Sequence, residues 1–456
     1  MPIPVEDASG FQGSAERWLA PSSVEELAAA LAEAHRLGIP VTPSGAGTGI
    51  TGGRCPDGGW VLSLERFTRL EAHAGYAVSG AGTLLKDVQA AAAKSGQFYA
   101  PDPTEWTASI GGNIATNASG SRSFRYGSTR RHIRALTAVF MDGSIRTFRR
   151  GEPLDFSFEP VPAPATTKNT AGYALQEGAT WIDLLAGSEG TLAIVAEAEL
   201  DLLPQPRQLL SGVVFFPDDE SALAAVDLWR PIPQLNMLEY MDAPSLDFLR
   251  GPYSNEIPRK ARACLMIEQE LDGLSGDAVD EWVDRLETAG ALEDSWFGET
   301  ARDRERFRAY RHTLPELVNA KVRANGFQKL SSDFAVPLSA NSRMLAFYRE
   351  SLAETCPGRF TIYGHIGDAH VHVNILSASS GHFEAGKQWM TLAAQTAVAL
   401  GGTVSAEHGL GKRKRQFLPL MYSERQILNM YKVKRRLDPN ALLSRGTLFP
   451  DLLVVD

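Results

Sequence analysis

The sequence predicts an α+β protein in which an alternating α/β region is followed by a second domain of helices and strands. As far as about residue 205, short apolar runs alternate with amphipathic helical patterns. Two prolines, Pro204 and Pro206, then interrupt the alternation. Longer amphipathic stretches and further strand-like runs follow them. The 456 residues give room for two or three domains of ordinary size.

Caps and glycines mark the elements of the first region. Residues 22–37 open with serines, carry apolar residues at helical spacing and stop at Gly38, which predicts a helix. Residues 39–43 ("IPVTP") predict a short buried strand that leads into a glycine-rich loop. Residues 59–64 ("GWVLSL") predict another strand, and residues 82–96 another helix.

The second region mixes both kinds of element. Residues 221–229 and 277–290 predict amphipathic helices, and residues 261–269 and 371–376 predict strands. We find no repeat with a period of 20 to 50 residues. The sequence therefore predicts three segments, which are 1–206, 207–430 and a turn-rich end, 431–456, that packs back on the first.

Composition excludes several classes of protein. A net charge of −9 argues against binding nucleic acid through bulk charge. No apolar run approaches the roughly 18 residues of a membrane span, and the first residues lack a secretory pattern, so we expect a cytoplasmic protein, free or held at the inner face of the membrane. Cys55, Cys264 and Cys356 are far apart with no CxxC pair, which excludes a disulfide framework and an iron–sulfur cluster.

A glycine-rich loop, "TPSGAGTGITGG" at residues 42–53, follows the predicted strand. Gly47, Gly49 and Gly52 fit GxGxxG, but the next residues, "GRCPDGG", cannot begin the helix that a Rossmann site needs. A Walker loop is excluded because no GK[ST] follows. What remains is a simple turn, or a loop whose backbone N–H groups face an anion.

Two more glycine clusters favour the interpretation as an anion-binding loop over that of a simple turn. Residues 109–120 ("SIGGNIATNASG") and 187–195 ("GSEGTLAIV") also lie beside predicted strands. Three such loops suit a long phosphate-bearing cofactor that lies along the backbone.

These loops belong to motifs that resemble a known family. "TPSGAGTGITGG", "PDPTEWTASIGGNIATNASG", "KNTAGYAL" and "DLLAGSEGTLAIVAEAEL" closely resemble, in order and approximate spacing, the FAD-binding domain of the vanillyl-alcohol-oxidase superfamily, the PCMH-type flavoproteins. The resemblance implies a PCMH-type FAD-binding domain of two α/β subdomains, over 1–206, followed by a ferredoxin-like α+β substrate or cap domain.

The resemblance also implies the residues of the FAD site. These are Pro43, Ser44, Gly45, Ala46, Gly47, Thr48, Gly49, Gly52, Pro103, Thr104, Ser109, Gly111, Gly112, Asn113, Asn117, Gly120, Tyr126, Gly127, Asn169, Gly190 and Ile194. No histidine lies in the first loop, so we expect FAD to be bound non-covalently. Cys55 is the one nucleophile there that offers an alternative.

A histidine cluster in the second region predicts a metal site. Three of the nine histidines fall within "HIGDAHVH", residues 365–372. His370, His372 and Asn374 alternate, so on a strand they share one face, and His365 can fold back across a turn. Much later, "SAEHGLG" supplies Glu407 and His408. Imidazoles with a carboxylate suit zinc, manganese or iron.

"GHIGDAHVHVN" and "AEHGLG" resemble the paired motifs of one branch, the FAD-dependent D-2-hydroxyacid dehydrogenases that act on D-lactate, glycolate or D-2-hydroxyglutarate. The resemblance implies that His365, His372 and Glu407 bind a divalent metal, zinc in the first place, and that His408 is the catalytic base. It leaves His370 as a further ligand or a neighbour of the ligands. It implies substrate-carboxylate roles for Arg311 and Lys329, while Asn374 is a candidate hydrogen-bond donor to the substrate.

The expected chemistry needs these groups. When a 2-hydroxy acid is oxidised to a 2-oxo acid, hydride leaves Cα for flavin N5 while the hydroxyl loses its proton. A chelating metal lowers the pKa of the hydroxyl, and a neutral histidine accepts the proton. Two alternatives stay open, a metal-independent flavin oxidase of another alcohol and a non-catalytic FAD-binding subunit of an electron-transfer complex.

Two basic runs concern the electron acceptor. Residues 122–150 hold eight arginines and one acid, Asp142, and residues 411–416 read "GKRKRQ". A solvated surface is the default interpretation. As an alternative, these runs dock an acidic acceptor protein or the membrane surface that holds a quinone, with a cytochrome or an electron-transfer flavoprotein as the protein acceptors. A homodimer is a further expectation from the resemblance.

Overall fold

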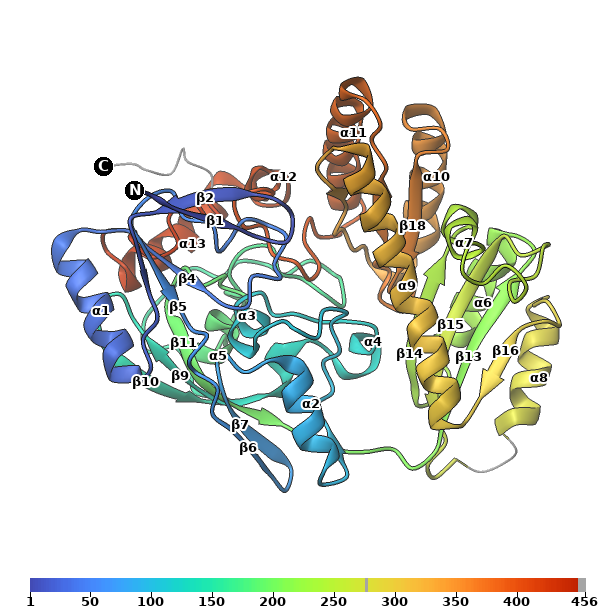
Figure 1. Cartoon of the computed structure of the whole chain (residues 1–456), viewed down its shortest axis with the longest axis horizontal. Helices are drawn as coiled ribbons and strands as arrows, with labels where there is room; N and C mark the ends of the chain where they lie inside the picture. Colours follow the sequence, from blue (N-terminus) through green and yellow to red (C-terminus); the bar gives the residue numbers. More distant parts are fainter. Residues whose placement is uncertain (275–277, 450–456) are drawn as a thin grey trace.

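The computed structural model describes residues 1–274 and 278–449, which form two bodies side by side (Figure 1). Residue 277, in the second predicted helix of the second region, and residues 450–456, in the predicted terminal segment, lie outside the described residues. No helix in the described part of the chain is long and apolar enough to cross a membrane.

The first body contains two main sheets. A parallel sheet has the order β3 (Arg17–Leu19), β5 (Trp60–Ser63), β4 (Val41–Ser44). An antiparallel sheet has the order β10 (Ile145–Arg149), β9 (Ile133–Val139), β11 (Ile194–Asp201), β7 (Tyr76–Gly80), β6 (Leu70–His73). Two small pairs complete it, β1 (Ile3–Glu6) with β2 (Gln12–Ala15), and β8 (Gln97–Phe98) with β12 (Leu203–Pro204).

The first helix of this body begins at a serine cap and ends at a glycine. Helix α1 (Val24–Leu37) is capped by Ser23, which accepts from the Glu26 N–H, and ends at Gly38 with φ 68°. The others are α2 (Leu85–Ala93), α3 (Ile110–Ala115), α4 (Ser123–Tyr126) and α5 (Trp181–Leu185). The helix predicted at 82–96 and the strand predicted at 59–64 are confirmed with shorter bounds, and the strand predicted at 39–43 is confirmed with bounds shifted to 41–44.

The second body is a seven-stranded antiparallel sheet with helices on both faces. Its order is β16 (Trp296–Gly298), β13 (Leu209–Phe216), β15 (Ala263–Glu270), β14 (Leu235–Met241), β18 (Phe360–Gly364), β19 (His372–Ile375), β17 (Leu330–Ser331). Its helices are α6 (Asp219–Trp229), α7 (Ala243–Leu249), α8 (Ala278–Thr288), α9 (Ala301–Asn325), α10 (Asn341–Thr355) and α11 (Ser380–Ala399). The strands and helices predicted for this region are confirmed.

Alternation along β13 shows how the sheet is covered. Val213 and Phe215 belong to the cluster that includes residues of α7 and α9. Val214 and Phe216 point the other way and belong to the cluster that includes Trp229 of α6. Because both faces are buried, the strand reads as a continuous apolar run.

The chain returns to the first body at its end. Helices α12 (Leu418–Met421) and α13 (Glu424–Leu437) lie with the blue N-terminal elements in Figure 1. The Lys434 ammonium donates to the carbonyl of Thr191, and the Val41 N–H donates to the carbonyl of Leu442 at 2.9 Å. The predicted boundaries at 206 and 430 stay predictions.

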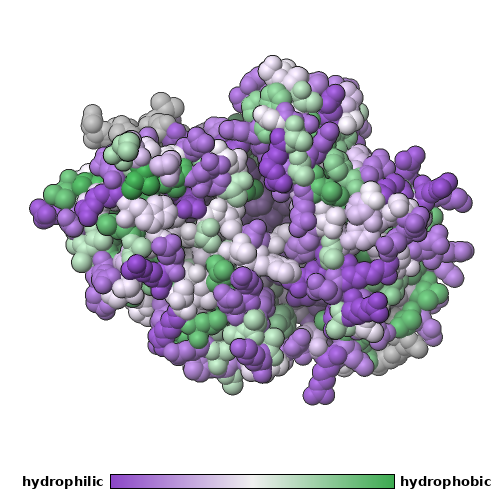
Figure 2. Space-filling view, viewed as in Figure 1, coloured by the Kyte–Doolittle hydropathy of each residue, from purple (hydrophilic) through white to green (hydrophobic). Residues whose placement is uncertain are grey.

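Polar contacts join the two bodies, and a hollow is visible on the face shown in Figure 2. Arg122 of the first body forms two hydrogen bonds, of 2.9 and 3.0 Å, with Glu268 of β15. Further on, Thr170 N–H donates to the Ser405 carbonyl at 2.8 Å.

Candidate active site

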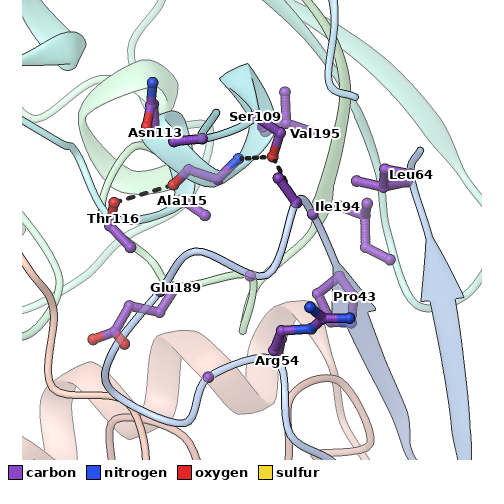
Figure 3. A pocket seen from close by; sticks show the side chains of 18 of the residues that line it. Pro43, Arg54, Leu64, Ser109, Asn113, Ala115, Thr116, Glu189, Ile194 and Val195 are labelled. Carbon is purple, nitrogen blue, oxygen red and sulfur yellow. Dashed lines mark hydrogen bonds between the residues drawn. The ribbon is translucent and has the colours of Figure 1, made fainter. Parts of the chain in front are cut away.

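A cleft of about 180 Å³, open to solvent, runs along the glycine-rich loop of the first body. Figure 3 shows Ser109, Asn113 and Thr116 on one side of it, with Pro43 and Arg54 on the other. The sequence-predicted FAD residues that line it are Pro43, Gly45, Ala46, Gly47, Thr48, Gly49, Ser109, Gly111, Gly112, Asn113, Gly190 and Ile194. The three glycine clusters therefore meet at one cleft.

Close approach explains two of the glycines. A Cβ on Gly45 would lie 2.4 Å from Ser109 Oγ, the atom that accepts from the Ala46 and Gly112 N–H groups. Gly47 has φ +83°, which side chains rarely adopt. Nothing lies within 4 Å of the position that a Cβ would take on Gly49 or Gly53, so these two residues leave open space for a ligand.

The remaining predicted FAD residues lie outside this cleft: Ser44, Gly52, Pro103, Thr104, Asn117, Gly120, Tyr126, Gly127 and Asn169. Asn117 and Asn169 line a second, polar cavity of about 180 Å³ beside Ala406. Thr104 accepts from Arg311, and Tyr126 hydrogen-bonds Glu270, so these two join the first body to the second. A Cβ on Gly120 would lie 2.0 Å from the Asp102 carbonyl, which is a packing reason for that glycine.

Sequence reasoning missed Glu189, whose side chain also lines the cleft. Its carboxylate accepts from the N–H groups of Leu410 and Gly411, at 2.9 and 2.7 Å. Burial raises the pKa of Glu189 to about 7. The residue ties the loop after His408 to the cofactor cleft, and only its place in the "GSEG" motif could have pointed to it. Cys55 is fully buried and burial raises its thiol pKa to about 11, which keeps it from attacking a flavin.

His365, His372 and Glu407 converge. His365 follows β18, a tight turn closes with Ala369 at φ 50°, and His372 opens β19. His365 Nε2 lies 3.3 Å and His372 Nε2 3.2 Å from Glu407 Oε1. The ligand atoms of these residues and of His370 all lie within 4.8 Å of one another.

The outer nitrogens of the two imidazoles are already occupied. His365 Nδ1 contacts Glu239 Oε1 at 2.5 Å, and His372 Nδ1 contacts the Ser332 carbonyl at 3.0 Å. Both rings therefore turn Nε2 toward Glu407, which is the arrangement that metal-binding histidines adopt with their supporting acceptors. The donor set fits a divalent ion. Glu239 and Ser332 were not predicted from the sequence.

Charges on the far side of Glu407 complete the cluster. Lys168 Nζ lies 3.4 Å from Glu407 Oε2 and 3.2 Å from Asp368, and Ser119 donates to Glu407 Oε2 at 2.8 Å. Burial alone would raise the pKa of Glu407, but the charges of His365 and Lys168 hold it well below its usual value. Glu407 is therefore ionised, with Oε1 left to face the imidazoles. Lys168, in the "KNTAGYAL" motif, was not predicted as a site residue.

His408 lies beside this cluster, and Asp333 holds it there. The His408 ring stacks on His372 with a centroid separation of 5.2 Å. Its Nδ1 lies 3.4 Å and its backbone nitrogen 2.9 Å from the Asp333 carboxylate. Burial lowers the pKa of His408 to about 3, against the attraction of Asp333. His370 is fully buried, with Nε2 at 3.2 Å from the same carboxylate.

The three predicted substrate-binding residues differ in whether their polar groups already have partners in the protein. Arg311 donates Nε and Nη2 to Glu239 Oε2, at 2.9 and 2.8 Å, so its charge is already balanced. Lys329 is half-buried, precedes β17 and has no ion pair among the described residues. Asn374 is buried beside the Tyr363 hydroxyl, and neither of its amide atoms has a hydrogen bond of normal geometry.

Family models match both bodies. A model of the FAD binding domain matches residues 15–149, and a model described as FAD linked oxidases, C-terminal domain, matches residues 205–448. The chain belongs to the FAD-linked oxidases. This FAD-linked oxidase is thus an oxidoreductase with FAD as cofactor, and the predicted family and enzyme class are confirmed.

Curated relatives of this FAD-linked oxidase match along nearly its whole length. D-lactate dehydrogenase of Archaeoglobus fulgidus is 33% identical over 93% of this chain and 89% of its own. D-2-hydroxyglutarate dehydrogenase of Xanthomonas citri is 30% identical over 94% and 88%, and glycolate oxidase subunit GlcD of Bacillus subtilis 28% over 96% and 90%.

A solved structure confirms the predicted fold class. Alkyldihydroxyacetonephosphate synthase superposes with a TM-score of 0.68 at 17% identity, over 94% of this chain and 75% of that chain. At this identity the likeness concerns the PCMH-type fold alone.

Proposed function

We propose that this protein oxidises a D-2-hydroxy acid to the 2-oxo acid, with non-covalent FAD and a divalent metal. One observation carries the proposal: His365 and His372 turn Nε2 toward the ionised Glu407, while His408 lies beside them with its own pKa lowered. Relatives named D-lactate and D-2-hydroxyglutarate dehydrogenases support this substrate class.

His365, His372 and Glu407 would hold the metal, zinc in the first place. When bound, FAD supplies the hydride acceptor at N5, and the metal supplies a Lewis acid for the substrate hydroxyl. Lys168 and Ser119 keep Oε2 of Glu407 occupied, so that a single oxygen faces the ion. Glu239 fixes the His365 ring from behind.

His408 would accept the hydroxyl proton. Its pKa is lowered to about 3, so the ring is unprotonated at neutral pH and offers a nitrogen lone pair to a proton. With Nδ1 directed at Asp333, Nε2 is the atom left to accept. Asp333 then stabilises the charge that forms on the ring.

Asn374 and Lys329 would bind the substrate. The amide of Asn374 has a donor and an acceptor to offer, and the Lys329 ammonium has no ion-pair partner among the described residues. Arg311 supports the site through Glu239 and keeps Nη1 on Thr104 at 3.2 Å. We propose that electrons pass to an external quinone, cytochrome or electron-transfer flavoprotein, and that the protein is cytoplasmic, free or at the inner face of the membrane.

Anaerobic reduction of the bound flavin tests the proposal. D-lactate, glycolate, D-2-hydroxyglutarate and the L-enantiomers of the chiral acids are added to the purified yellow protein, before and after dialysis against a chelator. We expect a D-acid to bleach the flavin, and chelation to abolish bleaching until metal is restored. Bleaching that survives complete metal removal would favour a metal-independent oxidase. A flavin that none of the acids reduces would favour a non-catalytic subunit.

A further inference from the structure

The basic run 411–416 is turned inward, which corrects the default expectation of a solvated surface. Lys412 Nζ donates to the Cys55 carbonyl at 2.7 Å, and the Arg413 guanidinium donates to the Ile50 carbonyl at 3.4 Å. These two cations are therefore engaged with backbone carbonyls of the glycine-rich loop and the turn after it. Neither is among the described residues that line the cofactor cleft, so its positive charge comes from another residue.

Arg54 is the one cation among the described residues that line the cleft. It follows directly on the glycine-rich loop, and Figure 3 shows it on the same side of the cleft as Pro43. A Cβ on Gly47 would collide with Nη1 of Arg54, so the guanidinium lies directly against this glycine. The guanidinium carbon also lies 5.8 Å from the centre of the Trp18 ring. The positive charge is thus placed at the loop itself.

Arg54 has no anionic partner in the described part of the chain. Its Nε is buried without a hydrogen bond, and the side chain forms no ion pair with a described residue. The two acids that line the cleft are engaged with backbone groups instead. Asp7 accepts from the Gly52 N–H at 2.7 Å, and Glu189 accepts from the N–H groups of the loop after His408. A cleft with an unbalanced cation favours the binding of an anion from outside the protein.

Backbone donors lie at the same place. The N–H groups of Gly47, Thr48 and Gly49 donate to no acceptor among the described residues, whereas the Ala46 N–H donates to Ser109 Oγ at 3.4 Å. Consecutive N–H groups without an acceptor are typical of an anion-binding loop. A guanidinium adds charge-assisted hydrogen bonds, which are stronger than those between neutral groups. The charge and the donors therefore meet at Gly47.

We propose that Arg54 is a cofactor-binding residue, which binds the diphosphate of FAD together with the N–H groups of residues 47–49. The diphosphate is the anionic part of this cofactor, whereas its flavin ring, ribityl chain and adenosine are neutral. The inference rests on the proposed function only for the binding of FAD, and neither the metal nor the 2-hydroxy acid enters it.

Titration of the FAD-free protein tests the inference, with binding followed by the quenching of flavin fluorescence. Arg54→Met removes the charge, Arg54→Lys keeps a point charge, and Arg36→Met at the exposed end of α1 is the matched control. Riboflavin, which lacks both phosphates, is the matched ligand. We expect Arg54→Met to weaken FAD by about 10- to 100-fold and riboflavin by less than about two-fold. Arg54→Lys should retain part of the affinity for FAD, and Arg36→Met all of it.

Two outcomes would overturn the inference. One is an affinity of Arg54→Met for FAD equal to that of the wild type. The other is an equal loss for FAD and riboflavin, because Arg54 would then support the shape of the cleft or the flavin ring rather than the diphosphate. Arg54→Gln provides a second variant if Arg54→Met does not fold, and the same difference between the two ligands is expected.

The proposed function fails separately. A wild-type protein that binds FAD but that no 2-hydroxy acid reduces would overturn the proposed function and leave the role of Arg54 intact. A wild-type protein that does not bind FAD would overturn both.

Discussion

The carboxylate of Asp333 lies 3.4 Å from Nδ1 of His408 and accepts the backbone N–H of the same residue at 2.9 Å. It also accepts from Ser405 Oγ at 2.7 Å and from the Glu407 N–H at 3.3 Å. Burial alone would raise the pKa of Asp333, but a hydrogen bond from His370 and the charge of Lys414 help to hold it well below its usual value. One buried anion therefore fixes the backbone of His408 and lies close to Nδ1 of its ring.

Replacing Asp333 by Asn should slow flavin reduction with little effect on flavin content. An amide NH₂ directed at Nδ1 favours the wrong tautomer of His408, so we expect kcat to fall by about 10- to 100-fold or more while KM changes little. Stopped-flow reduction with Cα-deuterated and ordinary substrate measures the step. A rise in KM with unchanged kcat would contradict a positioning role.

Replacing His408 by Ala should remove the proton acceptor and leave the flavin in place. The ring is about one-quarter exposed and stacks on His372, so its loss disturbs the fold little. We expect flavin reduction to slow by about 10²- to 10⁴-fold at neutral pH. The flavin spectrum and the thermal midpoint serve as controls. Near-normal reduction would show that another group accepts the proton.

Replacing Glu407 by Gln should lower metal content and activity together. The amide keeps the shape but removes the negative charge that Lys168 and both imidazoles face. We expect metal affinity to fall by at least about 10-fold, measured as bound metal per flavin after dialysis. Glu384→Gln, an exposed carboxylate on α11, is the control. Equal metal content in the two variants would argue that the cluster holds no ion.

The pH dependence of kcat/KM should reflect Lys329. Its folded pKa, about 8, lies below the ordinary 10.5 because of burial first and Lys414 second. The ammonium is thus lost above about pH 8, and kcat/KM should fall there because the carboxylate loses a cation. Lys329→Arg should shift this fall to higher pH.

The same shift affects folding with the opposite sign. Between about pH 8 and 10.5 the unfolded chain binds more protons at Lys329 than the folded one, so this residue's contribution to the free energy of unfolding rises with pH. A fall in kcat/KM without a matching fall in thermal midpoint separates the two effects.

Much of the fold follows from local sequence. Ser23 and Gly38 bound α1 because a cap oxygen and a left-handed residue are needed at its two ends. The strand predicted at 261–269 forms as β15 with continuous burial, because an apolar run can lie only between two covered faces. The helix predicted at 22–37 begins two residues later, which is the usual uncertainty at a cap.

For the site, the sequence by itself predicted the anion-compatible glycine loops, and its resemblance to a family singled out His365, His372, Glu407 and His408. Only the tertiary structure decided which groups support them. Glu239, Asp333 and Lys168 are far from the histidines in the chain and reach them through sheet pairing and the contact between the two bodies. The basic run 411–416 gives the sharpest contrast. Its charge pattern predicted a surface, whereas the backbone carbonyls and the buried loop around it, invisible in sequence, turned Lys414 inward.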